Sequence, residues 1–108
     1  MTSFTQNPGE SVPSIKVYFV ENVETGRIKV GFTTRSVAKR VARLQTGSDC
    51  ELRLLGVVGA CQVRGTTELQ LHRKFAKWRH RGEWFTREIL PLIWEILRAV
   101  DLQAQEPA

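Results

Sequence analysis

The fold of this chain is set by the stretch K-V-Y-F-V-E-N-V-E-T-G-R-I-K-V-G-F-T, residues Lys16–Thr33. Ile15–Glu21 and Ile28–Thr33 are dense in aliphatic and aromatic residues, and the Thr-Gly pair within Asn22–Arg27 suits a hairpin loop. We therefore expect two antiparallel strands. Because glycine weakens a strand, Gly31 predicts a point where another group approaches the backbone closely.

The remaining sequence predicts one further strand and three helices. Val37, Val41 and Leu44 recur at helical spacing, and Gly47 is placed to end that helix in the left-handed conformation. Pro91 must lie in the first turn of the last helix or kink it. The expected segments are a helix over Arg35–Thr46, a strand over Glu51–Gly59, a helix over about Arg64–Arg79, a loop over Arg79–Thr86 and a helix over Glu88–Leu102.

These segments predict one α+β domain over residues 15–102, between flexible tails at 1–14 and 103–108. The domain is expected to be a small three-stranded antiparallel sheet flanked by helices. Of the 108 residues 42% are hydrophobic, and no apolar run approaches the ~18–20 residues of a membrane span. The polar N-terminus shows no secretory signal, and Cys50 and Cys61 lack partners at metal-ligand spacing, so a cytoplasmic location with free thiols is expected.

The charge balance is basic. Sixteen Lys and Arg against eleven Asp and Glu give a net charge of +5. Such a balance favours a partner rich in phosphate, although many basic proteins bind no nucleic acid specifically. Charge alone therefore leaves the partner open.

Tyr18 is the only tyrosine in the chain, and it lies within the first predicted strand. The commoner interpretation is structural, with the ring in the core and the hydroxyl at the surface. The functional interpretation is a phenol that orients or deprotonates a water, which requires a nearby cation. Lys29 supplies that cation if the strand register brings the two side chains together.

Arg40 and Glu68 lie on or beside apolar helix faces. Arg40 is expected to be half-buried at the edge of its stripe, with Lys39 and Arg43 pointing away. Its guanidinium either caps apolar side chains or contacts a phosphate. Glu68 either stabilises its helix start or binds a hard divalent cation, weakly until a substrate phosphate arrives.

The other candidates carry weaker signals. His72, one turn beyond Glu68, is usually structural, but such a residue can also hydrogen-bond a ligand or shuttle a proton. Trp84-Phe85 is more typical of a loop anchor than of base stacking. The basic side chains expected to contact a nucleic-acid backbone are Arg35, Lys39, Arg43, Lys74, Lys77 and Arg81.

Together these residues resemble the motifs of the GIY-YIG nuclease superfamily. The first motif matches K-V-Y at 16–18 and the second K-V-G at 29–31, with Arg40 and Glu68 following in family order. The stretches K-R-V-A-R-L-Q-T-G, E-L-Q-L-H-R-K-F and R-G-E-W-F are similar to its small single-domain phage and bacterial branch. The resemblance covers about residues 15–97.

The resemblance implies divalent-metal-dependent cleavage of nucleic acid, with DNA favoured over RNA and with Mg²⁺ or Mn²⁺ as cofactor. Tyr18 would act as general base or orient the water, Arg40 would stabilise the scissile phosphate, and Glu68 would bind the metal. Target choice would come from the basic surface, from self-association into a homo-oligomer or from a protein partner.

The chain departs from the family pattern at two positions. Lys16 replaces the glycine of the first motif, and Lys29 replaces the first tyrosine of the second. By resemblance to superfamily members with lysine there, Lys29 is a catalytic candidate that lowers the pKa of the phenol or contacts phosphate. Gly31 and His72 are counted as structural members of the motifs.

Three functions are open at this point. The leading one is a metal-dependent DNA endonuclease. The alternative is a non-catalytic nucleic-acid-binding module on the same fold, which does not require Tyr18, Arg40 and Glu68 together. The third is a protein-interaction domain that uses Trp94 and the C-terminal helix.

Overall fold

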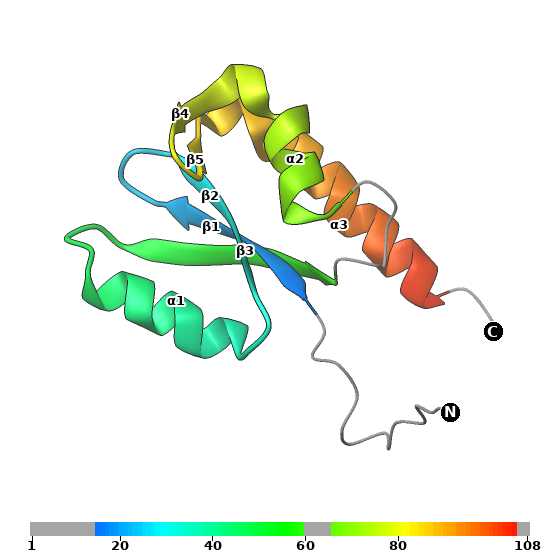
Figure 1. Ribbon diagram of the computed structural model, residues 1–108, viewed down its shortest axis with the longest axis horizontal. Coiled ribbons are helices and arrows are strands. Elements are labelled where there is room, and N and C mark those ends of the chain that lie inside the picture. The colour runs from blue at the N-terminus through cyan, green and yellow to red at the C-terminus, as the bar shows by residue number, and fades with distance from the viewer. Residues whose placement is uncertain (1–14, 60–65, 106–108) are drawn as a thin grey trace, which may run out of the picture.

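The computed structural model describes residues 15–59 and 66–105, which form one sheet with helices on both faces (Figure 1). The expected tail at 1–14, Cys61 and the expected helix start at Arg64 lie outside the described residues. The elements are β1 (Lys16–Asn22), β2 (Ile28–Thr33), α1 (Val37–Thr46), β3 (Leu52–Gly59), α2 (Glu68–Lys74), the 3-10 turn η2 (Ala76–Trp78), β4 (Arg79–Arg81), β5 (Trp84–Phe85), the 3-10 turn η3 (Arg87–Ile89) and α3 (Leu90–Gln105).

The sheet has five strands in the order β3-β1-β2-β5-β4, and each neighbouring pair is antiparallel. The expectation of a three-stranded sheet is therefore wrong. Arg79–Arg81 and Trp84–Phe85, expected within a loop, form a short hairpin that pairs with Ile28 and Lys29 of β2. Gly82 makes the turn at a φ of 56°, a conformation that glycine adopts without strain.

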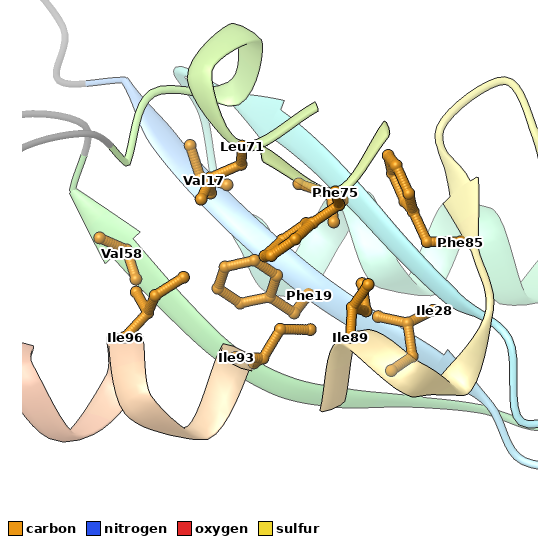
Figure 2. Packing of buried hydrophobic residues seen from close by; sticks show 11 residues of the cluster. Val17, Phe19, Ile28, Val58, Leu71, Phe75, Phe85, Ile89, Ile93 and Ile96 are labelled. Carbon is orange, nitrogen blue, oxygen red and sulfur yellow. The ribbon is translucent and has the colours of Figure 1, made fainter. Parts of the chain in front are cut away.

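One face of the sheet carries the core, under α2 and α3 (Figure 2). Side chains alternate across a strand, so Val17 and Phe19 of β1 point to this face together with Ile28 and Val30 of β2. Phe75 and Phe85 meet edge to face above them, with ring centroids 6.0 Å apart. The other members of the cluster are Val58, Leu71, Ile89, Ile93 and Ile96.

A buried carboxylate ties three elements at the border of this core. Glu21, at the end of β1, accepts hydrogen bonds from Arg53 of β3 at 2.8 Å and from Arg87 of η3 at 2.7 Å. The hydrogen bond from Arg53, followed by the contribution of Arg87, lowers the pKa of Glu21 despite its burial. This arrangement has a structural role, because Glu21 joins Arg53 of the sheet to Arg87 in the last turn before α3.

The helices differ from expectation mainly at their ends. Ser36 caps α1 by accepting from the backbone N–H of Lys39. Gly47 has a φ of −92°, so the expected left-handed end is wrong, and its N–H instead bonds the carbonyls of Leu44 and Gln45. A capping box between Thr67 and Gln70 starts α2 later than expected.

The C-terminal helix begins after a separate 3-10 turn and extends further than expected. It runs from Leu90 to Gln105, so Pro91 lies in its first turn, where the missing N–H of proline costs no helical hydrogen bond. In the described parts of the chain, no helix has the length and apolar character needed to cross a bilayer.

Candidate functional site

Val30 organises the candidate site through its backbone at the outer edge of β2. Because β5 pairs only with Ile28 and Lys29, the Val30 groups lie beyond the end of that ladder. The Val30 N–H donates to the carbonyl of Glu83 at 3.0 Å, and the Val30 carbonyl accepts from His72 Nε2 at 2.9 Å. These two bonds bring α2 and the β4–β5 turn to one point of the sheet edge.

Tyr18 lies on the opposite face from the core, directly over Gly31, its partner in the register of β1 and β2. A Cβ added to Gly31 would lie 2.6 Å from both Cζ and the hydroxyl oxygen of Tyr18. The expected close approach to Gly31 is therefore confirmed, and the approaching group is the Tyr18 ring. Tyr18 is only 2% exposed, and its hydroxyl, which is not fully buried, forms no hydrogen bond with any residue that the structure describes.

The charges around the Tyr18 phenol come from α1, from α2 and from the turn between β4 and β5. Burial has the largest effect and raises the pKa of Tyr18, the Arg40 guanidinium lowers that pKa, and the Glu83 and Glu68 carboxyls raise it further. The net direction is upward, so the phenol keeps its proton at neutral pH. Arg40 of α1 is therefore the cation that acts on Tyr18.

Glu68 and Glu83 form a pair of neighbouring carboxyl groups beside this phenol. Burial first, then the charge of Glu83 and a hydrogen bond with its carboxyl, raise the pKa of Glu68, while His72 and Lys29 lower it. The Glu68 side chain is 23% exposed, and its Oε2 lies 3.9 Å from His72 Nε2.

Lys29 supplies a positive charge to this pair. Its Nζ lies 2.9 Å from Oε1 of Glu83 and 5.9 Å from the centroid of the Trp84 ring. In the register of the hairpin, Lys29 is opposite Val20, so Tyr18 is its diagonal neighbour. Lys29 therefore directs its charge at the carboxyl pair.

A basic pocket of about 290 Å³ adjoins Arg40 at the start of α1. Within the described ranges, none of its four cations has an ion pair with a carboxylate. Their charge is thus free to bind an external anion. The pocket is lined by Thr33, Arg35, Ser36, Lys39, Arg40 and Arg43.

A family model described as the T5orf172 domain matches residues 15–101 of this chain. The chain belongs to the T5orf172 domain family. This is a phage-associated domain, and membership is compatible with a nuclease or nucleic-acid-binding role without specifying catalysis or a metal. Comparison with curated proteins gave no significant match, and neither did comparison with solved structures.

In this T5orf172 domain, the four residues expected to carry catalysis come from four elements. Tyr18 of β1, Lys29 of β2, Arg40 of α1 and Glu68 of α2 are linked through shared neighbours, with Glu83 acting on both Tyr18 and Glu68. Arg40 is half-buried, as expected. The arrangement brings the charges of one guanidinium and two carboxyl groups to bear on a single phenol.

The six basic residues expected to contact nucleic acid fall into separate groups. Arg35, Lys39 and Arg43 gather at the α1 pocket. Lys77 instead stacks over the Trp78 ring at 4.5 Å, and Arg81 lines a different pocket of about 200 Å³ with His80 and Trp84. Lys74 is exposed at the end of α2.

His72 connects α2 to the sheet. Its Nε2 donates to the Val30 carbonyl, its Nδ1 lies 3.4 Å from Arg79 Nη2, and its ring meets Phe85 edge to face at 5.2 Å. Both ring nitrogens are therefore engaged within the domain. Trp94, the residue of the third hypothesis, is 45% exposed on α3.

Glu83 is the member of the site that the sequence reasoning missed. It lies in the R-G-E-W-F stretch between Gly82, with its positive φ, and the strand residue Trp84. A carboxylate held between a turn glycine and an aromatic anchor is the signal that could have identified it. In the described part of the chain, no group of three or more His, Cys, Asp and Glu side chains is arranged to hold a metal ion.

Proposed function

We propose that this T5orf172 domain is a divalent-metal-dependent endonuclease that hydrolyses phosphodiester bonds in DNA. The observation that carries the proposal is that the charges of Arg40 and Glu68, from two helices, both act on the phenol of Tyr18 in β1. The same residues occupy the positions at which the sequence resembles the GIY-YIG nucleases, and we infer a relationship to that superfamily.

The metal would bind at Glu68. Carboxylate oxygens are preferred ligands of Mg²⁺ and Mn²⁺, and Mg²⁺ is commonly held by one or two carboxylates together with substrate phosphate. The carboxyl neighbour that raises the pKa of Glu68 makes this position favourable for a cation. When bound, the cation would neutralise charge that develops on the phosphate.

Tyr18 would orient the attacking water. Its raised pKa favours a protonated phenol, which positions a water by hydrogen bonding, over a phenolate that acts as general base. The ring is fixed against Gly31 and the hydroxyl has no partner in the described residues, so it is available for this contact.

Arg40 would bind the scissile phosphate as negative charge develops in the transition state. A guanidinium can give two parallel hydrogen bonds to phosphate oxygens, and Arg40 has no carboxylate ion pair among the described residues. The adjoining cations of the α1 pocket, Arg35 and Lys39 among them, would hold the neighbouring phosphates. The DNA backbone would then run along the start of α1.

A plasmid-nicking assay tests the proposal. The purified protein is incubated with supercoiled plasmid, single-stranded DNA and RNA, in Mg²⁺, Mn²⁺ or EDTA. We expect metal-dependent nicking of DNA that falls by about 10²-fold or more in Tyr18→Phe and in Glu68→Gln. Arg98→Ala, on the exposed side of α3, is the control and should retain activity. Nicking that persists in EDTA, or full activity in Glu68→Gln, would contradict the proposal.

A non-catalytic nucleic-acid-binding module is the second candidate, and the basic pocket at α1 favours it. It predicts that the protein retards DNA on a gel, with affinity that falls steeply as salt rises, and that no product forms with either metal. The nicking and retardation assays together separate the two functions.

A further inference from the structure

Trp84 lies beside a pocket that the proposed chemistry leaves unused. We propose that Trp84, with Arg27 and Arg81 beside it, stacks on an unpaired base, so that the substrate is DNA with a single-stranded segment next to the cleaved phosphate. The inference rests on the proposed function in one respect, namely that the ligand is a nucleic acid. It adds a site for a base and a class of substrate.

The register of the sheet places Trp84 on the same face as Tyr18. Residues directly opposed in an antiparallel pair share a face, and Lys29 is opposite both Val20 of β1 and Trp84 of β5. Val20 and Tyr18 are two residues apart in β1, so they also share this face. Because β5 lies two strands away from β1, the two strands are about 10 Å apart.

Trp84 and Phe85 have different roles although they are neighbours in sequence. Phe85 is fully buried, and its ring packs against Phe75 in the core. Side chains alternate along a strand, so Trp84 points to the opposite face, where it is only partly buried. On that face α1 packs against β3 and β1, at the other side of the sheet from β4 and β5 (Figure 1). Part of the Trp84 side chain therefore stays accessible.

The accessible part of Trp84 lines a pocket of about 200 Å³ between two hairpins. A register shift between Arg79 and Arg81 leaves an extra residue in β4, so both His80 and Arg81 reach the pocket. Pockets for whole drug-sized molecules measure about 300–1000 Å³, so this one suits a single planar ring. The lining residues are Asn22, Thr25, Arg27, His80, Arg81 and Trp84.

The charge of this pocket matches a nucleic-acid strand. Its lining includes no carboxylate, and neither Arg27 nor Arg81 has an ion pair within residues 15–59 and 66–105. Both arginines are exposed. An aromatic ring beside free cations is the combination that holds single strands, because bases stack on the ring while the cations contact phosphates.

Asn22 offers hydrogen-bond donors in the same pocket. Its Oδ1 accepts from the N–H groups of Glu24 at 3.0 Å and Thr25 at 3.1 Å. Its NH₂ group forms no hydrogen bond with a residue of the described ranges, so it can donate to an acceptor on the edge of a base.

The Trp84 ring is less occupied by a cation than the Trp78 ring. Lys77 Nζ lies 4.5 Å from the centroid of Trp78, whereas Lys29 Nζ lies 5.9 Å from that of Trp84, near the limit of about 6 Å for a cation–π contact. The Lys29 ammonium is instead held by Glu83 at 2.9 Å. Trp84 is therefore the better platform for a base.

One short strand can reach both Trp84 and the phosphate site at Arg40. The 10 Å between β1 and β5 corresponds to about three stacked nucleotides at 3.4 Å each. A base inside a duplex is stacked and paired, so its face cannot meet the Trp84 ring. This is why the pocket indicates a substrate with unpaired bases.

The test measures binding by fluorescence anisotropy in EDTA, where no cleavage occurs, over a range of salt concentrations. The probes are a thymidine strand of about 12 nucleotides, an abasic strand with the same number of phosphates, a blunt duplex and thymidine monophosphate as competitor. The variants are Trp84→Leu, Trp84→Phe and Arg81→Ala. The control is Trp94→Leu, at an exposed tryptophan of α3, and circular dichroism checks that each variant is folded.

We expect the wild type to bind the thymidine strand about tenfold more tightly than the abasic strand. Trp84→Leu should remove this preference and leave the salt dependence unchanged, because stacking releases no counterions, whereas Trp84→Phe should keep most of it. Arg81→Ala should reduce the slope of log affinity against log salt by about 0.7. Trp94→Leu should match the wild type, and Trp84→Leu should not alter duplex binding.

The inference is overturned if the wild type does not distinguish the two strands, or if Trp84→Leu still does. Thymidine monophosphate that binds as tightly as the strand would also overturn it, because the pocket would then be a site for free nucleotides. If Trp84→Leu does not fold, photo-crosslinking of the wild type to a 5-iodouridine strand decides, and a crosslink away from residues 79–85 refutes the contact.

The nicking assay separates this failure from that of the proposed function. Metal-dependent nicking that is equally fast on duplex and single-stranded DNA, and unchanged in Trp84→Leu, would refute the base contact alone. Absence of nicking in the wild type would refute the proposed function, while the binding measurements in EDTA still decide the base contact.

Discussion

Replacement of Gly31 by alanine is expected to displace the Tyr18 ring. The rate of plasmid nicking should fall strongly, and the free energy of unfolding should fall only modestly. The added Cβ would lie 2.6 Å from Cζ and from the hydroxyl oxygen, and 3.0 Å from Cε1. Carbon atoms in contact prefer about 3.5–4.0 Å, so the ring must move by about 1 Å. Overpacking of this kind costs about 1–3 kcal/mol of unfolding free energy, and a 1 Å misplacement of a catalytic group costs about 10²-fold in rate.

Gly56→Ala is a matched control for this prediction. Its Cβ would also lie 2.6 Å from a side-chain atom, Cδ1 of Leu97, but on the core face and at the flexible end of a leucine. Urea unfolding should give no larger a stability loss for Gly56→Ala than for Gly31→Ala, because the end of a leucine can shift, and plasmid nicking should fall only in Gly31→Ala. In a Tyr18→Phe background, Gly31→Ala should cause little further loss of activity. Wild-type nicking by Gly31→Ala, or an equal loss in Gly56→Ala, would refute the reasoning.

Three further predictions concern stability, the phenol and the DNA path. Glu21→Gln should lose about 1–2 kcal/mol in urea unfolding at neutral pH, since the carboxylate holds two arginines that are themselves exposed. Because the folded pKa of Glu21 is lowered, the carboxylate contributes its full stabilisation above the unfolded carboxyl pKa of about 4.3, and this stabilisation is lost as pH falls through the folded pKa. A stability difference between Glu21→Gln and wild type that stays unchanged in acid would count against this account. Arg40→Met should raise the pKa of Tyr18 further, and ultraviolet absorbance can follow this directly because the chain has one tyrosine; a downward change would refute the assigned contact. Lys39→Ala should reduce the slope of log affinity for duplex DNA against log salt by about 0.9 if it meets one phosphate, whereas Lys77→Ala, whose ammonium lies over Trp78, should leave the slope unchanged.

Local patterns were sufficient to predict the β1–β2 hairpin, α1 and the half-buried position of Arg40. Each depends on residues close in sequence, so period-2 and period-3.6 spacing reveals it. Gly31 was informative for the same reason: a glycine within an apolar strand indicates a close neighbour, although its identity as Tyr18 required the register.

The β4–β5 hairpin and Glu83 could not be predicted in this way. Strands of three and two residues are too short to show alternation, and what places them is the buried Phe85 and the positive φ of Gly82. The position of Glu83 depends on a backbone bond to Val30, more than fifty residues earlier in the chain. The ion pair between Lys29 and Glu83 depends on that same tertiary contact, so it could not be predicted either.

The shortness of β5 bears on how side chains from the two faces of the sheet can act on one another. Glu68 belongs to the helical layer over the core, whereas Tyr18 lies on the face with α1, and a continuous sheet would separate them. β5 ends its pairing at Lys29, and at the next residue of β2 the Val30 N–H bonds the carbonyl of Glu83 while the Val30 carbonyl accepts from His72 of α2. A hairpin extended by one more pair of residues would bond the Val30 carbonyl through its own backbone and so remove the contact with His72. In the proposed nuclease, the length of the β4–β5 hairpin would therefore decide whether α2 can reach this edge of β2.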